Sequence, residues 1–112
     1  MVANVGISWI YLIVAGLMET GWAVGLKYTE GFSKLFPSIV TVVCMIGSFY
    51  FLSKSLTELP LGTAYAFWTG IGIIGTVVMG IVLFGESKDI PRILSIVLIL
   101  GGIIGLRIAT PG

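Results

Sequence analysis

The sequence predicts an all-α membrane protein with four transmembrane helices. Of its 112 residues, 57% are hydrophobic and only 10% are charged, whereas an ordinary soluble domain has about 25% charged residues. Mean hydropathy is +1.13, and the polar residues are clustered between long apolar segments. A soluble domain needs polar residues along every element, so this pattern indicates a chain embedded in a bilayer.

Four apolar segments define one transmembrane domain over residues 1–112. Crossing a bilayer takes about 20 helical residues at about 1.5 Å rise per residue. The first three segments reach or nearly reach that length. The apolar centre of the fourth is shorter, but Arg92 and Arg107 can extend their side chains to the two interfaces. The expected spans are 7–26, 35–52, 61–84 and 90–109, joined by short connections that contain glycine or proline.

Charge and residue usage exclude several classes of function. Six Lys or Arg against five Asp or Glu give a net charge of +1, and the basic residues are scattered singly, so neither nucleic-acid binding nor a polybasic lipid anchor is indicated. One cysteine excludes an intrachain disulfide, and the lack of histidine removes a common metal ligand and any imidazole proton relay. We therefore expect no metal, no cofactor and no enzymatic activity. Any proton movement has to use carboxylates.

Glu19 is the charged residue deepest in an apolar segment. It lies about 2.5 residues past the centre of its span, roughly 4 Å from the bilayer midplane. An ionised carboxylate at that depth costs on the order of a few kcal/mol even on lenient insertion scales, so such residues commonly serve ion or proton movement. The alternative is a protonated Glu that hydrogen-bonds a neighbouring helix, a role that Asn or Gln fills at lower cost. Glu19 is therefore the principal candidate for the functional site.

Three aromatic residues and one serine are candidates to line a site around Glu19. Trp22 is one helical turn away, and its indole offers an N–H donor and a π-face to a cation, with plain packing as the alternative. Tyr65 and Trp68 share one side of the third segment with several small residues. Trp68 is deep for an interfacial anchor, whereas Tyr65 can serve as one. Ser48 hydrogen-bonds either a neighbouring helix or, as is commoner, a carbonyl of its own helix.

Small residues, and aromatic residues near the segment ends, predict how the helices pack and where they meet the membrane surface. Gly101 and Gly105 form a small-xxx-small pair, which makes the fourth helix the dimerisation candidate. The glycines of the third segment indicate close helix packing, with a bend needed for switching as the sharper alternative. Trp9, Tyr11 and Tyr28 are expected at the interfaces.

The basic residues of the loops give only a weak orientation signal. Lys27, Lys34, Lys88 and Arg92 lie on one side of the predicted membrane, and Lys54 and Arg107 lie on the other. A chain with so little bias can insert in both directions. Two oppositely oriented copies would then form an inverted pair, like the internal inverted repeats of larger transporters.

Several short motifs together resemble the small multidrug resistance family. The similarity covers nearly the whole chain beyond the first few residues, and the combination is highly specific. Its parts are Glu19-x-x-Trp22, Leu26-Lys27-Tyr28, Gly31-Phe32, Pro60-x-Gly62-Thr63-Ala64-Tyr65-Ala66-x-Trp68-Thr69-Gly70-Ile71-Gly72 and Phe84-Gly85-Glu86. The Trp after the membrane Glu and the run that ends in Trp-Thr-Gly look like the guanidinium exporter subtype rather than the quaternary ammonium subtype.

This resemblance implies an antiparallel homodimer in the bacterial inner membrane that exchanges protons for guanidinium. Glu19 would be the shared site for proton and substrate, with the four lining candidates around it, and Ser48 and Trp22 are then candidates to orient the carboxylate. A carboxylate suits guanidinium because it accepts two parallel N–H donors. Thr20 and Gly21 depart from the apolar pair expected between Glu and Trp, so the resemblance alone does not fix selectivity.

Three other functions stay open at this point. An exporter of quaternary ammonium and other hydrophobic cations needs a looser aromatic cavity for substrates that lack N–H donors. A non-transporting partner subunit would use the glycine faces to stabilise a larger complex. A passive pore would conduct without saturable, proton-dependent exchange.

The weak charge bias predicts a dimer of oppositely oriented chains. A tag at one terminus, probed with a membrane-impermeant label in intact and in opened cells, should be found on both sides of the membrane. Detection on a single side in every molecule would contradict the antiparallel arrangement.

Overall fold

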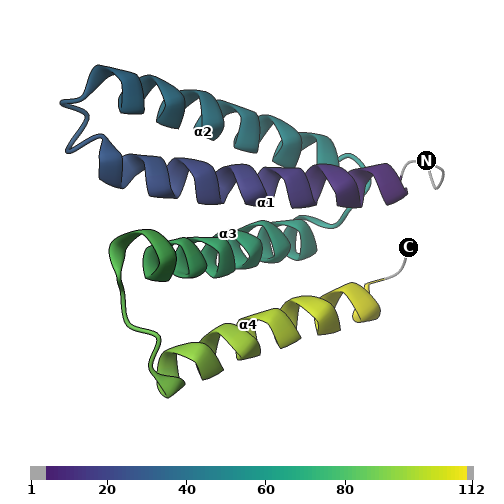
Figure 1. Cartoon of the computed structure of the whole chain (residues 1–112). Helices are drawn as coiled ribbons and strands as arrows, with labels where there is room; N and C mark the ends of the chain where they lie inside the picture. The colour runs from purple at the N-terminus through teal and green to yellow at the C-terminus, as the bar shows by residue number, and fades with distance from the viewer. Residues whose placement is uncertain (1–4, 111–112) are drawn as a thin grey trace.

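The computed structural model describes residues 5–110, which form four α-helices that run up and down in turn (Figure 1). The helices are α1 (Val5–Tyr28), α2 (Leu35–Ser55), α3 (Leu61–Phe84) and α4 (Ile90–Ala109). All four are long and apolar enough to cross a membrane. The prediction of an all-α chain with four transmembrane helices is therefore confirmed. α3 and α4 have the expected bounds, whereas α1 and α2 run slightly beyond theirs.

Proline and glycine set the ends of α3 and α4. Pro60 occupies the N-cap position of α3 in an extended conformation, and Pro91 lies in the first turn of α4, where a missing N–H costs nothing. α3 ends at Gly85, which has the left-handed backbone (φ 64°) that glycine adopts without strain. This glycine turns the chain away from α3 and toward the short connection to α4.

The helices form a single flat layer. α1 lies between α2 and α3, and α4 packs beside α3 at the edge of the layer (Figure 1). The chain measures 44 × 35 × 16 Å, and its thickness is not much more than the diameter of one helix with side chains, about 10–12 Å. A layer this thin encloses little on its own, so its broad faces are open to lipid or to another chain.

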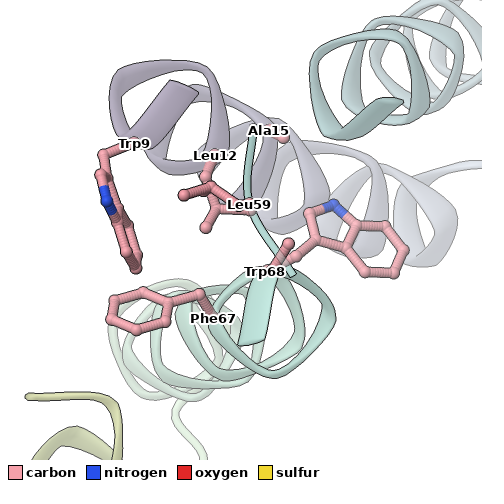
Figure 2. Close-up of a cluster of buried hydrophobic side chains, with 7 residues drawn as sticks. Trp9, Leu12, Ala15, Leu59, Phe67 and Trp68 are labelled. Atoms are coloured by element: carbon pink, nitrogen blue, oxygen red, sulfur yellow. The ribbon is translucent and has the colours of Figure 1, made fainter. Parts of the chain in front are cut away.

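A small apolar cluster fills the contact between α1 and α3 near one end of the layer (Figure 2). Trp9 packs edge-on against Phe67, with ring centroids 4.8 Å apart, and the guanidinium carbon of Arg107 lies 4.6 Å from the centroid of Trp9. Trp9 is therefore buried inside the chain, and its place at the membrane interface stays a prediction. Its partners come from α3 and α4, which the position of Trp9 in the sequence does not reveal.

Glycines allow the close approach of neighbouring helices, which was the packing role expected for the glycines of the third segment. A Cβ atom added at Gly75 would overlap Thr20, one added at Gly16 would overlap Ile71, and one added at Gly70 would overlap Ile103. The first two contacts join α1 to α3, and the last joins α3 to α4. Close packing is thus the role of these glycines within the chain.

The proposed dimerisation pair on α4 is free within the chain. Among residues 5–110, no neighbouring side chain lies within 4 Å of a Cβ atom built at Gly101 or Gly105, and no residue of α4 is buried. This face is therefore available for a second helix, although a single chain does not test what covers it.

Substitutions at Gly70 and Gly101 should separate packing within the chain from packing between chains. Gly70→Val should lower the free energy of unfolding in mild detergent by about 1–3 kcal/mol, because it overpacks the contact with Ile103. Gly101→Val should leave the unfolding of the monomer unchanged and weaken chemical cross-linking between chains. Equal destabilisation of the monomer by both variants would contradict this division.

Candidate functional site

Glu19 lies on the side of α1 that packs against α3, where Gly72 leaves room for its carboxylate. A Cβ atom added at Gly72 would overlap the Glu19 side chain, so the lack of a side chain at position 72 provides the space that the carboxylate occupies. Its Oε1 atom is buried and has no hydrogen-bond partner among residues 5–110. An unpaired buried acceptor is costly, so this oxygen is a good candidate for binding a ligand or a proton.

An open cavity of about 280 Å³ lies beside Glu19 between α1 and α3. Except for Glu19, its lining is small or apolar. A carboxylate against walls of this kind has few competing dipoles, and this arrangement favours a cation as its partner. Within residues 5–110, no group of three or more His, Cys, Asp or Glu is placed to hold a metal ion. The cavity is lined by Glu19, Ala23, Gly72, Ile73, Thr76 and Val77.

Ser48 and Trp68 form a hydrogen-bonded chain that ends on the backbone of α1. Trp68 Nε1 donates to Ser48 Oγ at 2.9 Å, and Ser48 Oγ donates to the carbonyl oxygen of Ala15 at 2.7 Å. Both side chains are buried. In an α-helix that carbonyl also accepts the backbone N–H of residue 19, so the chain holds the helical turn that carries Glu19. Ser48 thus bonds a neighbouring helix, which corrects the commoner expectation of a bond within its own helix.

Trp22 joins this region through Phe49, which the sequence did not single out. The ring centroids of Trp22 and Phe49 are 6.4 Å apart, and those of Phe49 and Trp68 are 5.8 Å apart. The indole Nε1 of Trp22 is buried, and the described part of the chain offers it no acceptor. Trp22 therefore keeps a free donor one helical turn from the unpaired Glu19 oxygen. Phe49 belongs to no sequence motif. Its part in this aromatic group is evident only from its position between the two indole rings in the structure.

Tyr65 lies at the outer edge of the aromatic group. Its ring centroid is 5.5 Å from that of Trp68, yet the residue is 55% exposed. Its exposed ring is free to contact a ligand, lipid or a second chain. Both interpretations of Tyr65, as part of the site and as an interfacial anchor, remain compatible with this position.

The predicted site residues are partly brought together. Trp68 contacts Ser48 and Tyr65 directly, while Trp22 connects to them through an additional ring. Over the described range 5–110, the Ser48 hydroxyl bonds the α1 backbone and no hydrogen bond joins it or Trp22 to the Glu19 carboxylate. Ser48 therefore positions the helix that carries Glu19 rather than orienting the carboxylate itself. Thr76 was not predicted as a site residue. It lines the cavity because it lies four residues after Gly72 on the same face of α3.

Thr20 and Gly21, the residues that depart from the family pattern, do not line the cavity beside Glu19. Thr20 packs against Gly75 of α3 and donates from its hydroxyl to the Gly16 carbonyl oxygen at 3.4 Å. A Cβ atom at Gly21 would lie 3.5 Å from the Cys44 sulfur of α2. Both residues act in helix packing, so their effect on a ligand beside Glu19 is indirect.

Comparisons with known proteins identify a matching family and similar relatives. The family model described as Small Multidrug Resistance protein matches residues 7–99. A guanidinium exporter of Yersinia pseudotuberculosis is 57% identical over 103 residues, which cover 92% of this chain and 99% of that relative. Guanidinium exporters of Proteus vulgaris and Escherichia coli (strain K12) are 58% and 56% identical over the same share of this chain, covering 99% and 98% of those relatives.

The hydrogen-bonded chain from Trp68 to Ala15 should be measurable by a double-mutant cycle. Ser48→Ala leaves the buried Trp68 N–H without its acceptor, so we expect a loss of about 1–3 kcal/mol in the free energy of unfolding. In the Trp68→Phe background, the same substitution should cost less, by a coupling energy of about 0.5–3 kcal/mol. Unfolding in detergent measures both.

Ser38→Ala is the matched control on the same helix, because the Ser38 hydroxyl bonds only the Lys34 carbonyl in an exposed first turn. It should change stability little in either background. Additive effects of Ser48→Ala and Trp68→Phe would show that the two side chains are not coupled.

Proposed function

This chain belongs to the small multidrug resistance family, and from that premise we propose that it exports guanidinium across the bacterial inner membrane in exchange for protons. The observation that carries the proposal is the Glu19 carboxylate, which lies beside an open, mostly apolar cavity with one oxygen buried and unpaired among residues 5–110. The relatives named guanidinium exporter support the choice of substrate. The four membrane-spanning helices make the chain a multi-pass membrane protein.

The chemistry of guanidinium suits this site. Guanidinium is a planar cation with N–H donors arranged as a fork, and a carboxylate accepts two of these donors in parallel. Trp22 and Trp68 do not line this cavity, and they support the site through the packing of α1 against α2 and α3. Thr76 adds a hydroxyl to the cavity wall. These groups support recognition of a small cation and need no catalytic step, so we propose a transporter rather than an enzyme.

Competition at one carboxylate provides the coupling. Ionised Glu19 binds the cation, and protonated Glu19 does not, so proton and guanidinium exclude each other from the site. If the site opens alternately to each side of the membrane, a proton binds Glu19 on one side and guanidinium leaves on that side; on the other side the proton leaves and guanidinium binds. The proton gradient then drives guanidinium outward. No second ionisable group at membrane depth is needed for this exchange.

We further propose that the functional unit is an antiparallel homodimer. The chain is a thin layer whose broad faces are open, and α4 presents Gly101 and Gly105 without a neighbour inside residues 5–110. A second copy in the opposite orientation would cover these faces and add its own Glu19 to the enclosed space. The weak bias of the basic residues is compatible with both orientations.

Glu19 should be essential for exchange and for its response to pH. In proteoliposomes that contain only this protein, guanidinium uptake should saturate, should require a proton gradient, and should weaken as the pH falls and the carboxylate protonates. Glu19→Gln should abolish uptake together with this pH response. Glu19→Asp should keep part of the exchange with a shifted pH profile, because it keeps the charge and shortens the reach.

Four results would contradict the proposal in different ways. Guanidinium binding by Glu19→Gln with wild-type affinity would make Glu19 a structural residue. Transport of tetramethylammonium without transport of guanidinium would favour an exporter of quaternary ammonium ions. Flux that does not saturate and ignores the proton gradient would indicate a pore, and absence of any flux from the purified protein would indicate a partner subunit.

A further inference from the structure

The cavity beside Glu19 continues along α1 and α3 toward the loop between α3 and α4. A second cavity of about 80 Å³ follows the first and shares Ala23 and Thr76 with it. On α1 the lining passes from Glu19 through Ala23 to Lys27, in steps of four residues. Residues at this spacing share a helix face and lie about 6 Å apart along the axis, so the groove is about 12 Å long.

α3 lines the opposite wall of this groove with a parallel row. Gly72, Thr76 and Gly80 follow one another at the same four-residue spacing. The two glycines serve the same purpose, since a Cβ atom at Gly72 would overlap the Glu19 carboxylate and a Cβ atom at Gly80 would overlap the Glu86 carboxylate. Near each end of the groove, therefore, an acidic side chain packs directly against a glycine of α3.

The backbone holds Glu86 at the outer end of the groove. Gly85 takes the left-handed conformation that ends α3, and the Glu86 N–H then donates to the Gly80 carbonyl oxygen at 3.2 Å. This turn brings the Glu86 side chain back over Gly80 and into the lining of the second cavity. Capping of α3 needs only the backbone of residue 86, so it does not explain a carboxylate in the groove.

The partner of Glu86 within the chain is itself a guanidinium group. Arg92 Nη2 donates to Glu86 Oε1 at 2.8 Å, and the side chains are 31% and 40% exposed, respectively. Exposed ion pairs of this kind contribute little to stability, so the pair opens readily. Arg92 displays the planar fork of N–H donors that free guanidinium also carries.

We propose that Glu86 is a second, outer guanidinium-binding site, which Arg92 occupies at rest and which a guanidinium ion enters when Arg92 releases. This inference rests on the proposed function, because it takes guanidinium as the substrate. An ion on Glu86 is about 12 Å along the groove from Glu19, with Thr76 between them. Glu86 raises the local concentration of guanidinium at the outer end of the groove. The ion then reaches Glu19 sooner.

Neighbouring cations keep this outer site weak. Lys27 lines the same cavity, with its Nζ 4.8 Å from the centroid of the Phe84 ring, and Arg92 competes for the carboxylate from its own chain. A tethered competitor acts at high effective concentration, so guanidinium visits Glu86 briefly and does not accumulate there. A weak site at the mouth favours transit, whereas tight binding there would slow exchange.

The test compares Glu86 with another acidic loop residue at the same end of the helical layer. Glu30 pairs with Lys34 at 3.9 Å, with both side chains largely exposed, and it does not line the groove. Initial rates of guanidinium uptake into proteoliposomes would be measured against guanidinium concentration for the wild type, Glu86→Gln, Glu30→Gln, Arg92→Gln and the double variant Glu86→Gln/Arg92→Gln. Size-exclusion profiles in detergent check that each variant is folded.

Glu86→Gln should raise KM about two- to fivefold, the range expected for an exposed charge pair, with Vmax unchanged. Glu30→Gln, which removes the same charge, should leave KM unchanged. Arg92→Gln should lower KM because it frees Glu86, and this effect should disappear in the double variant. Arg92→Gln also keeps the test decisive if Glu86→Gln does not fold.

Several results would overturn the outer site. Equal shifts in KM for Glu86→Gln and Glu30→Gln would show that Glu86 acts only through the overall negative charge of this end of the protein and binds no guanidinium itself. A lower KM for Arg92→Gln that persists in the double variant would exclude Glu86 as the group that Arg92 covers. A loss of Vmax at constant KM in Glu86→Gln would make the pair a structural tie between α3 and α4. A wild type without saturable, Glu19-dependent uptake would overturn the proposed function, and this inference with it.

Discussion

The packing of α1 against α3 through glycines is the constraint on which the rest of the structure depends. Gly72 and Gly75 bring the α3 backbone close enough for Glu19 and Thr20 of α1 to lie against it. A larger residue at position 72 would push the carboxylate out of its space. In a bilayer no water is available to satisfy a displaced carboxylate, so its position has to be built from the contacts of its own helices.

This contact also determines where polar chemistry is possible in an otherwise apolar chain. The groove follows the matched rows on α1 and α3, and both of its carboxylates are seated on glycines of α3. On the other side of α1, the bond from Ser48 to the Ala15 carbonyl fixes the same helical turn from α2. Glu19 is thus held between two helices, while its cavity stays open. This combination of a fixed carboxylate and an accessible space is what an exchange site for a small cation requires.

Much of this arrangement could be predicted from the sequence, and the rest could not for physical reasons. Segment length and hydropathy predict the four helices, and the cost of burying a charge in lipid singles out Glu19. Which helices touch depends on tertiary packing, so the sequence did not reveal that Ser48 bonds α1, that Phe49 lies between Trp22 and Trp68, or that Trp9 is buried against Phe67. The sequence placed Glu86 only in a motif after the third segment, whereas the turn at Gly85 and the space at Gly80 bring its side chain into the groove.

We propose that one carboxylate, Glu19, binds either a proton or guanidinium. The most direct measurement is the number of protons released when guanidinium binds to the detergent-solubilised protein in weakly buffered solution, across a range of pH. We expect proton release at low pH, where Glu19 is protonated before binding, a decline toward zero as the pH rises, and no release from Glu19→Gln. Guanidinium binding without proton release at every pH, or equal release from Glu19→Gln, would contradict it.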